Sequence, residues 1–575
     1  MTPPQFTSKF RNLSLASWKA FLTDREEQVF LVLTLLIGAL VGLVVVAFIG
    51  LTGRFSAQFY PHDGSPWRRL FVPIFGSLGA GYLLYKYFPD ARGSGVPQTK
   101  AALYARDGYI GFRTIIGKFF CTAATLASGL PLGREGPSVQ VGAGIASVLG
   151  RKLGLRPEKV KSLIPVGAAA AVAAAFNTPL AAVLFALEEV VGDLHAPVLG
   201  SVVLASATSW AVLRLLLGNE PLFQVPQYQL VNPWEFVVYA LLGIAGGVVS
   251  VAFTQSLIRL RAWFKKQSPK TLWIQPVAGG LVVGIMGWFV PSVMGVGYQY
   301  VGDVLNNHTP LKLILLLLGL KLIATAVSYA SGNAGGIFGP SLFLGAMLGG
   351  AIGSVAHNLF PNHVASAGAY ALVGMGTAFA GIIRAPMTSV VMIFEITRDY
   401  AVIVPLMLSN LVSYFIASRL QKEPIYEVLA EQDGIHLPKS GGRPRILRQV
   451  ALVMRPAKIV LPADESIHSA RNAWEQSPQK TWVVSDDHGV VGLVTRKELE
   501  KALEEGSLDT TIRSLVPQSE FPHVHSDHTL DQALDRMGYN RIDLLPVVSR
   551  ANIRELLGVI RLQDILESYG VNPKP

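Results

Sequence analysis

The chain has very little cysteine and few charges. Cys121 is the only cysteine in 575 residues, so an intramolecular disulfide is excluded. Charged residues make up 15% of the chain, well below the roughly 25% that is usual in soluble domains. No signal-peptide pattern precedes the first apolar run, because Asp24, Glu26 and Glu27 stand directly before it. These features exclude a disulfide-stabilised secreted protein.

Long apolar runs dominate what remains. Hydrophobic residues form 51% of the chain, and the mean hydropathy is +0.41. A membrane-spanning helix needs about 20 apolar residues, and several runs are long enough. Other runs are short or broken by glycine and proline, and such backbone survives at membrane depth only when it is packed in protein or lines a cavity. We therefore predict a polytopic all-α membrane bundle with broken and re-entrant helices in a lipid bilayer. The runs cover roughly 29–53, 70–88, 114–130, 163–191, 198–217, 236–253, 272–293, 311–330, 335–356 and 370–417.

The net charge of +11 has a simple explanation in a membrane protein. Loops on the cytoplasmic side carry an excess of lysine and arginine. Lys9, Arg11, Lys19 and Arg25 precede the first apolar run, which predicts a cytoplasmic N-terminus. The basic residues form no single dense patch, so we expect no nucleic-acid partner.

Two blocks of the apolar region recur in its second half. The Gly-Pro-Ser block at 136–138 returns at 339–341, an offset of 203. The block at 166–188 returns at 373–395, an offset of 207. Glycine-broken hydrophobic segments at corresponding positions of two halves are typical of transporters, whose substrate site lies between the halves. The sequence therefore predicts two internally repeated halves and leaves open whether the repeats are inverted.

One ionisable side chain stands where the membrane tolerates it least. Glu135 lies in the segment Gly-Arg-Glu-Gly-Pro at 133–137, between two apolar runs. An intramembrane acid usually lies on a functional pathway. Glycine and proline also mark a helix start here, and free N–H groups at a helix N-terminus bind anions. The Glu135 carboxylate is therefore a candidate plug of an anion site, whose removal depends on protonation.

Three further elements resemble parts of an anion pathway. They are Gly-Ser-Gly-Val-Pro at 93–97, Gly-Gly-Ile-Phe-Gly-Pro at 335–340, and Tyr426 after the last apolar run. Each is weak alone. Together with the Glu135 segment, in this order and with the internal repeat, they resemble the CLC chloride channel and transporter family. The resemblance extends from the first apolar run to Tyr426.

The resemblance implies two chloride sites. At the central site, Ser94 and Tyr426 would donate hydroxyls, and Ile337 and Phe338 would donate backbone N–H groups. Oriented dipoles and hydroxyls can bind an ion selectively yet release it. The outer site would be formed by the backbone N–H groups of Arg134, Glu135 and Gly136.

A second acid bears on the type of transport. Glu188 has Glu395 as its repeat equivalent, so we expect Glu188 to be architectural, whereas Glu189 is an additional acid. In the CLC family, exchangers carry a glutamate here that passes protons from the cytoplasm, and typical channels carry an apolar residue. The resemblance therefore implies a proton role for Glu189. The alternative is a solvated acid at a helix end.

The composition changes after Leu420, and a second repeat follows. Each copy is predicted to contain a helix, two strands joined by a turn, and a helix, which is typical of a soluble α/β module. The tail resembles a tandem pair of CBS domains. This resemblance implies an adenine-nucleotide site at Asp564 and Thr495, although Glu498 departs from the expected aspartate. A purely structural pair is the alternative.

These observations predict a proton-coupled chloride antiporter gated by Glu135 with Glu189 as internal proton relay. We expect a homodimer with both termini cytoplasmic, in a prokaryotic inner or plasma membrane. We expect no enzymatic chemistry, metal or required cofactor. A passive voltage- or proton-gated chloride channel, a fluoride exporter and a membrane-anchored nucleotide sensor remain alternatives. The predicted divisions are an N-terminal segment at 1–27, a transmembrane domain at 28–426, a linker at 427–450, and CBS domains at 451–506 and 507–575.

Overall fold

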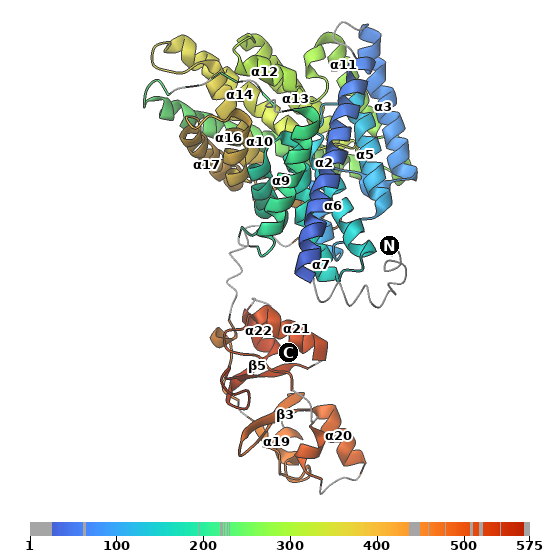
Figure 1. Cartoon of the computed structure of the whole chain (residues 1–575), viewed down its shortest axis with the longest axis vertical. Helices are drawn as coiled ribbons and strands as arrows, with labels where there is room; N and C mark the ends of the chain where they lie inside the picture. The colour runs from blue at the N-terminus through green and yellow to red at the C-terminus, as the bar shows by residue number, and fades with distance from the viewer. Residues whose placement is uncertain are drawn as a thin grey trace, which may run out of the picture. The chain divides into compact units, whose positions relative to one another are not determined.

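The computed structural model describes residues 26–568, except 61–64, 195, 219–221, 224, 227, 229, 436, 438–448, 458, 476, 478, 506–509, 517–520 and 541. The predicted N-terminal segment therefore lies almost wholly outside the described residues. The chain forms two compact units, residues 1–440 and 441–575. The first is helical, and the second contains helices and strands (Figure 1).

The helical unit is built from two series of helices that correspond in order. Its first series is α2 (Glu26–Phe59), α3 (Pro66–Lys86), α4 (Val96–Ala105), α5 (Phe112–Ala127), α6 (Glu135–Lys152), α7 (Pro157–Phe176), α8 (Pro179–Phe185), the π-helix η2 (Ala186–Val191) and α9 (Leu199–Leu217). Its second series is α10 (Glu235–Lys265), α11 (Pro276–Phe289), α12 (Tyr298–Leu305), α13 (Leu311–Ala330), α14 (Phe338–Leu359), α15 (Ala367–Ile383), α16 (Pro386–Thr397) and α17 (Ile403–Leu420), followed by α18 (Ile425–Gln432).

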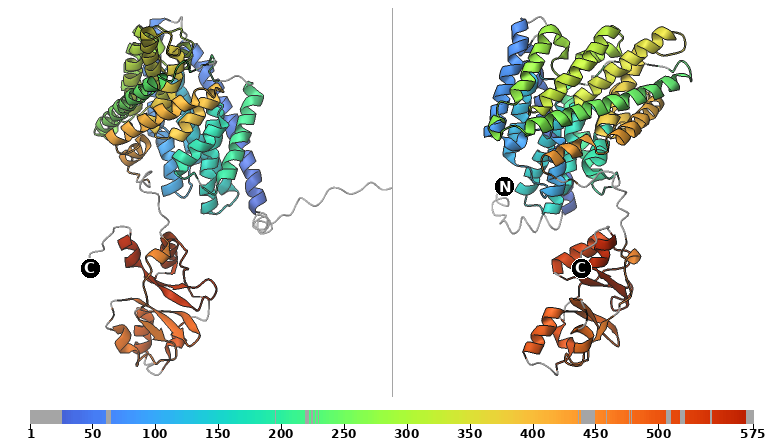
Figure 2. Two further views of the ribbon diagram at one scale, coloured as in Figure 1. Left: turned by 90° about the vertical axis from the view of Figure 1, so that its left-hand side faces the viewer. Right: turned by 180° about the vertical axis from the view of Figure 1, so that it is seen from behind.

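The repeat predicted from the sequence is visible in the packing. In the first series α2 packs on α9, and in the second α10 packs on α17. The pairs α6 with α7 and α14 with α15 correspond in the same way. Figure 2 shows these helices from two further sides. Equivalent elements thus make equivalent contacts, which confirms two structurally repeated halves.

Broken helices are also confirmed. Among the described residues, seven helices are long and apolar enough to cross a membrane. The apolar run at 163–191 is divided into α7, α8 and η2, and the run at 370–417 into α15, α16 and α17. Pro179 and Pro386 open the second piece of each run, where a missing N–H costs nothing. The short helices α8 and α16 therefore begin at these breaks, and α8 continues directly into η2.

Two glutamates cap these short helices crosswise. Glu188 accepts hydrogen bonds from the backbone N–H of Met387 and Thr388 at the start of α16, at 3.2 and 2.8 Å. Glu395 accepts hydrogen bonds from the N–H of Leu180 and Ala181 at the start of α8, at 2.9 and 2.7 Å. A carboxylate at a helix N-terminus satisfies free N–H groups and complements the helix dipole. The expectation that Glu188 is architectural is confirmed.

The tail consists of two similar α/β halves. The first contains β1 (Val460–Pro462), α19 (Arg471–Glu475), β2 (Thr481–Asp486), β3 (Gly489–Thr495) and α20 (Arg496–Glu504). The second contains α21 (Leu530–Asn540), β4 (Leu544–Val548), β5 (Leu556–Arg561) and α22 (Leu562–Ser568). Strands β2 and β3 pair antiparallel, as do β4 and β5. Val483, Leu493, Val548 and Val559 share one apolar cluster, so the halves pack together.

Two predicted boundaries differ from the structure. The linker was expected from residue 427, but α18 continues through this position to Gln432 and belongs to the helical unit. The first tail domain was expected from 451, but Val450 packs in the core of the second half. Its N–H donates to His528 O at 2.8 Å. Val450 thus belongs to the tail because it bonds to a distant part of the chain. Composition alone does not reveal such a bond.

Candidate functional site: an anion and proton pathway

Two helix N-termini meet at the centre of the helical unit. Gly133 precedes α6 and Gly336 precedes α14, and the two residues exchange backbone hydrogen bonds of 2.7 Å in both directions. They are repeat equivalents, 203 residues apart (336 − 133). Reciprocal bonding between equivalent residues is the geometry of a local two-fold axis. Two positive helix ends therefore converge where the sequence predicted the anion site.

Glu135 is buried at this junction. It is the first residue of α6 and is 0% exposed. Its Oε1 accepts a hydrogen bond from the Tyr298 hydroxyl. Its Oε2 makes no hydrogen bond to the described residues and lies against Gly133 and Gly339, where a Cβ would be 2.3 and 3.2 Å from it. The carboxylate is thus held by one donor on one oxygen, between the two helix starts.

The Ser94 loop packs directly against the start of α6. Gly95 has φ +106°, and a Cβ there would lie 2.2 Å from Gly136 O. Only glycine combines this backbone conformation with such a close approach. Behind the loop, the buried Lys118 amine donates to Ala91 O at 2.9 Å and Gly93 O at 2.7 Å. The loop is therefore fixed from both sides.

Three buried hydroxyls lie near each other along this path. Ser94, Tyr426 and Tyr329 are each at most 2% exposed, and their oxygens make no hydrogen bond within the part of the chain that the structure describes. Tyr329 lies next to Ser94, and Tyr426 lies within electrostatic range of Tyr329, Glu135 and Glu189. Buried hydroxyls normally have a partner. This group suits a small dehydrated anion, and Tyr329 is a member that the sequence reasoning missed.

An apolar wall surrounds the start of α14. The Phe338 ring contacts the rings of Phe176, Phe185 and Phe379, with centroids 4.8, 5.4 and 4.5 Å away. Ile337, the residue before α14, is also fully buried. Electrostatic interactions are stronger beside such low-dielectric walls. The N–H groups predicted to bind chloride therefore lie in a strongly desolvated setting.

Glu189 lies on η2 and is not solvated. It is 6% exposed, and its Oε1 is 2.9 Å from the Lys100 amine. Lys100 lies on α4, one helical turn beyond the Ser94 loop. The alternative of a solvated helix-end acid therefore does not hold. Glu427 and Glu188 also interact electrostatically with Glu189.

Arg134 stands directly before Glu135 and lies beside Tyr298. Its guanidinium carbon lies 5.7 Å from the centroid of the Tyr298 ring. Both residues border a cavity of about 390 Å³ that Arg69 and Tyr300 also line. The guanidinium therefore lies against the ring of the residue that donates to the Glu135 carboxylate.

The residues predicted to bind nucleotide have partners inside the tail. Asp564 is 2% exposed and pairs with Arg561 at 2.8 Å and with Arg455 at 2.9 Å. Thr495 donates its hydroxyl to Glu498 at 2.7 Å, as part of the cap of α20. These contacts favour the structural alternative for the tail. Among the described residues, no group of three His, Cys, Asp or Glu side chains could hold a metal ion.

Comparison with known families agrees with this arrangement. The family model of the voltage gated chloride channel matches residues 76–418, which is more than half of the chain. The chain belongs to the CLC family. The CBS domain model matches residues 448–505 and 512–570, so this CLC protein carries two CBS domains in its tail.

Relatives of this CLC protein include transporters from several bacteria. A putative chloride channel protein ClcB-like from Ralstonia nicotianae is 34% identical over 368 residues, covering 63% of this chain and 85% of the relative. An H(+)/Cl(-) exchange transporter ClcA from Salmonella gallinarum is 31% identical, covering 73% and 93%. The crystal structure of a slow cyanobacterial Cl-/H+ antiporter has a TM-score of 0.65 and 26% identity, covering 70% and 97%. The chain is thus an integral membrane protein with a CLC transport unit.

Proposed function

We propose that this CLC protein exchanges chloride for protons, with Glu135 as the gate. The observation that carries the proposal is the buried Glu135 carboxylate between the starts of α6 and α14. The N–H groups of Arg134, Glu135 and Gly136 would bind the outer chloride. An anion and a carboxylate then compete for the same donors, so chloride binding and protonation of Glu135 favour each other.

The central chloride would be bound by Ser94, Tyr426 and the N–H groups of Ile337 and Phe338. The buried hydroxyls of Ser94 and Tyr426, which have no hydrogen-bond partner among the described residues, support this assignment, and Tyr329 would add a third hydroxyl. When Glu135 takes up a proton, its attraction to the helix starts weakens and the path opens for chloride. When Glu135 loses the proton, the carboxylate returns and closes the path.

Protons would reach Glu135 through Glu189. Glu189 and Glu135 both interact electrostatically with Tyr426, which supports a route that links the two acids. The ion pair with Lys100 holds the Glu189 side chain in the position where it would receive a proton. Chloride and protons would then share the route near Glu135 and separate beyond it, because Glu189 lies beside the Ser94 loop rather than in it.

The names of two relatives support exchange over passive conduction, whereas the relative from Ralstonia nicotianae is a putative chloride channel protein. Those from Vibrio campbellii and Salmonella gallinarum are exchange transporters. We further propose a homodimer with both termini in the cytoplasm of a prokaryotic cell, and a tail that modulates the rate. The buried Glu189 favours the exchanger over the channel, because a passive chloride path needs no internal acid.

The test is the Glu135→Ala variant in liposomes. A chloride gradient should drive proton movement in the wild type, and the variant should lose this movement while chloride still passes. Glu158→Ala, an exposed acid at the start of α7, is the matched control and should behave as wild type. Proton pumping at the normal rate by the Glu135 variant would show that another group is the gate.

A further inference from the structure

The loop before α12 is the repeat equivalent of the Ser94 loop. Gly-Val-Gly at 295–297 stands 202 positions (295 − 93) after Gly-Ser-Gly at 93–95, and α12 begins 202 positions (298 − 96) after α4. The glycines of the first loop have φ +89° and +106°, and those of the second have φ +62° and +87°. Such values favour glycine, so the two loops share a backbone course. Residues 293–297, which lead directly into Tyr298, are here named the Tyr298 loop.

A buried lysine holds each loop. Lys118 on α5 donates to the carbonyls of positions 91 and 93. Lys321 on α13 is 0% exposed and donates to Val293 O at 3.1 Å and to Gly295 O at 2.6 Å. The two pairs of carbonyls are again 202 positions apart (293 − 91). Buried carbonyls need donors, so each amine fixes the backbone to which it is bonded.

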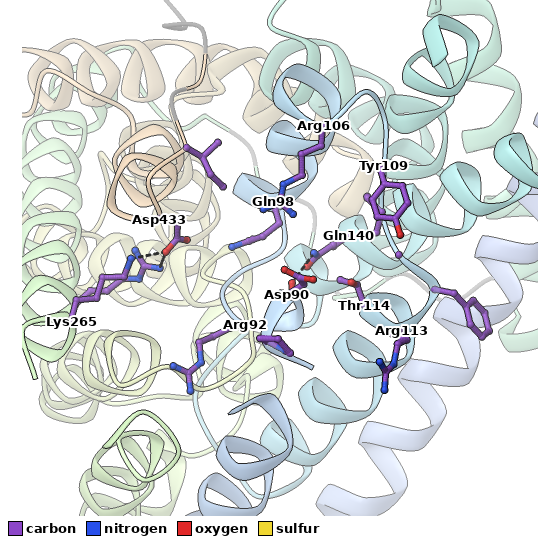
Figure 3. A pocket seen from close by; sticks show the side chains of 16 residues that line it. Asp90, Arg92, Gln98, Arg106, Tyr109, Arg113, Thr114, Gln140, Lys265 and Asp433 are labelled. Atoms are coloured by element: carbon purple, nitrogen blue, oxygen red, sulfur yellow. Dashed lines mark hydrogen bonds and ion pairs between the residues drawn. The ribbon is translucent and has the colours of Figure 1, made fainter. Parts of the chain in front are cut away.

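Both loops have one side that protein does not cover. Arg92 and Gln98 flank the Ser94 loop and line a cavity of about 480 Å³, which Figure 3 shows from close by. The Tyr298 loop lines the cavity of about 390 Å³ described above. Packing on the cavity side cannot hold a loop in place. The buried amine on the other side therefore has this task.

Behind the Tyr298 loop the packing is tight. A Cβ on Gly297 would lie 2.7 Å from the Phe343 ring and 3.0 Å from Lys321 Nζ. The same Nζ lies 4.4 Å from the centroid of the Phe343 ring. The ammonium thus supports the backbone of the residue directly before Tyr298.

The two loops present their hydroxyls at different positions. Val296 stands where the first loop has Ser94 (296 − 94 = 202), and Tyr298 stands where the first loop has Val96. The Tyr298 hydroxyl donates to Glu135 Oε1, whereas the Ser94 hydroxyl has no partner among the described residues. One loop therefore presents a hydroxyl to the gate, and the other presents a hydroxyl that an anion could accept.

We propose that Lys321 is a positioning residue for the gate, because it places the Tyr298 hydroxyl on Glu135. Without the ammonium the Tyr298 loop moves toward the cavity, and the hydrogen bond to Glu135 weakens. The protonated form of Glu135 is then favoured at higher pH. Lys118 holds the Ser94 loop in the same way and acts on the central chloride instead. This inference rests on the proposed function of Glu135.

Chloride flux from liposomes over a range of pH tests this role in the full-length protein. Lys321→Met should raise the pH of half-maximal flux by about one unit, and by no more than the roughly one to two units expected from loss of the Tyr298 hydroxyl. Lys321→Arg keeps a cation with several donors and should restore the wild-type profile. Lys312→Met removes an exposed lysine from the same helix and should behave as wild type.

Two comparisons separate positioning from general damage to the bundle. In the Tyr298→Phe background, Lys321→Met should cause no further shift. A shift that adds fully would overturn the proposal, because Lys321 would then act on Glu135 without Tyr298. Lys118→Met removes the equivalent buried amine, and it should weaken calorimetric chloride affinity without moving the pH of half-maximal flux.

A second variant moves the Tyr298 loop while the lysine stays. A Cβ on Gly295 would lie 2.7 Å from the Tyr60 hydroxyl, so Gly295→Ala should also raise the pH of half-maximal flux. This variant decides the matter if Lys321→Met does not fold.

The Glu135→Gln variant distinguishes failure of the inference from failure of the proposed function. Wild-type pH dependence in Glu135→Gln would show that Glu135 is not the gate. Loss of pH dependence there, together with a wild-type profile in Lys321→Met and Gly295→Ala, would leave the gate in place and overturn the role of Lys321.

Discussion

Replacing Tyr298 with phenylalanine removes one hydroxyl from the gate and leaves the ring beneath Arg134 in place. A hydrogen bond to a charged group contributes about 1.5–3 kcal/mol, and one pH unit corresponds to about 1.36 kcal/mol. The bond stabilises the carboxylate form of Glu135, so its loss favours the protonated form at a given pH. The pH at which proton-coupled flux is half-maximal should therefore rise by about one to two units.

The assay is chloride and proton flux from liposomes over a range of pH, recorded together with two electrodes. A double-mutant cycle on chloride flux provides the control, because the effect of Tyr298→Phe on the pH dependence of chloride flux should disappear in the Glu135→Gln variant, which has no proton-coupled flux. An unchanged pH profile would refute the importance of the hydrogen bond. A shift of equal size in the Glu135→Gln background would show that Tyr298 acts on a different group.

Three other predictions follow from the same structure. Glu189→Gln should stop proton movement and leave chloride flux unchanged, and both are measured in the same liposomes. Normal proton flux in this variant would show that Glu189 has only a structural role. Ser94→Ala with Tyr426→Phe should weaken calorimetric chloride affinity about tenfold or more, because two hydroxyl donors to a charged ion are lost; wild-type affinity would contradict the central site. Asp564→Ala leaves two arginines without their carboxylate, so the tail should melt several degrees lower by calorimetry and any response of flux to adenine nucleotides should disappear. An unchanged melting temperature would contradict the structural role of this ion pair.

Much of the fold could be predicted because its elements recur within one chain. The offsets of 203 and 207 residues locate the starts of α14 and α16 from those of α6 and α8. Breaks in the apolar runs were predicted from glycine and proline, whose backbone effects are local. Residue 450 was misplaced because its partner, His528, lies far away in the sequence. Long-range pairing of this kind leaves no local pattern.

The same contrast applies to the site. Glu135 and Glu189 stand out because an acid in an apolar segment is expensive wherever the chain folds. Tyr298 and Lys100 were missed, since a tyrosine or lysine becomes meaningful only when its partner is known, and these partners are 163 and 89 residues away. A signal for Lys118 did exist. Lys321 stands 203 residues later and donates to Val293 O and Gly295 O, as Lys118 does to Ala91 O and Gly93 O.

The crosswise capping by Glu188 and Glu395 has a consequence for how the protein can be assembled. Each half supplies the carboxylate that completes a helix start in the other, so neither half contains all the groups that its own short helix needs. A first half synthesised alone would leave the N–H groups of Leu180 and Ala181 without their acceptor. Two copies of such a half could serve each other, however, because each carries both a donor helix and an acid. The single chain thus has the pattern of a fused dimer, in which each half completes a helix start of the other.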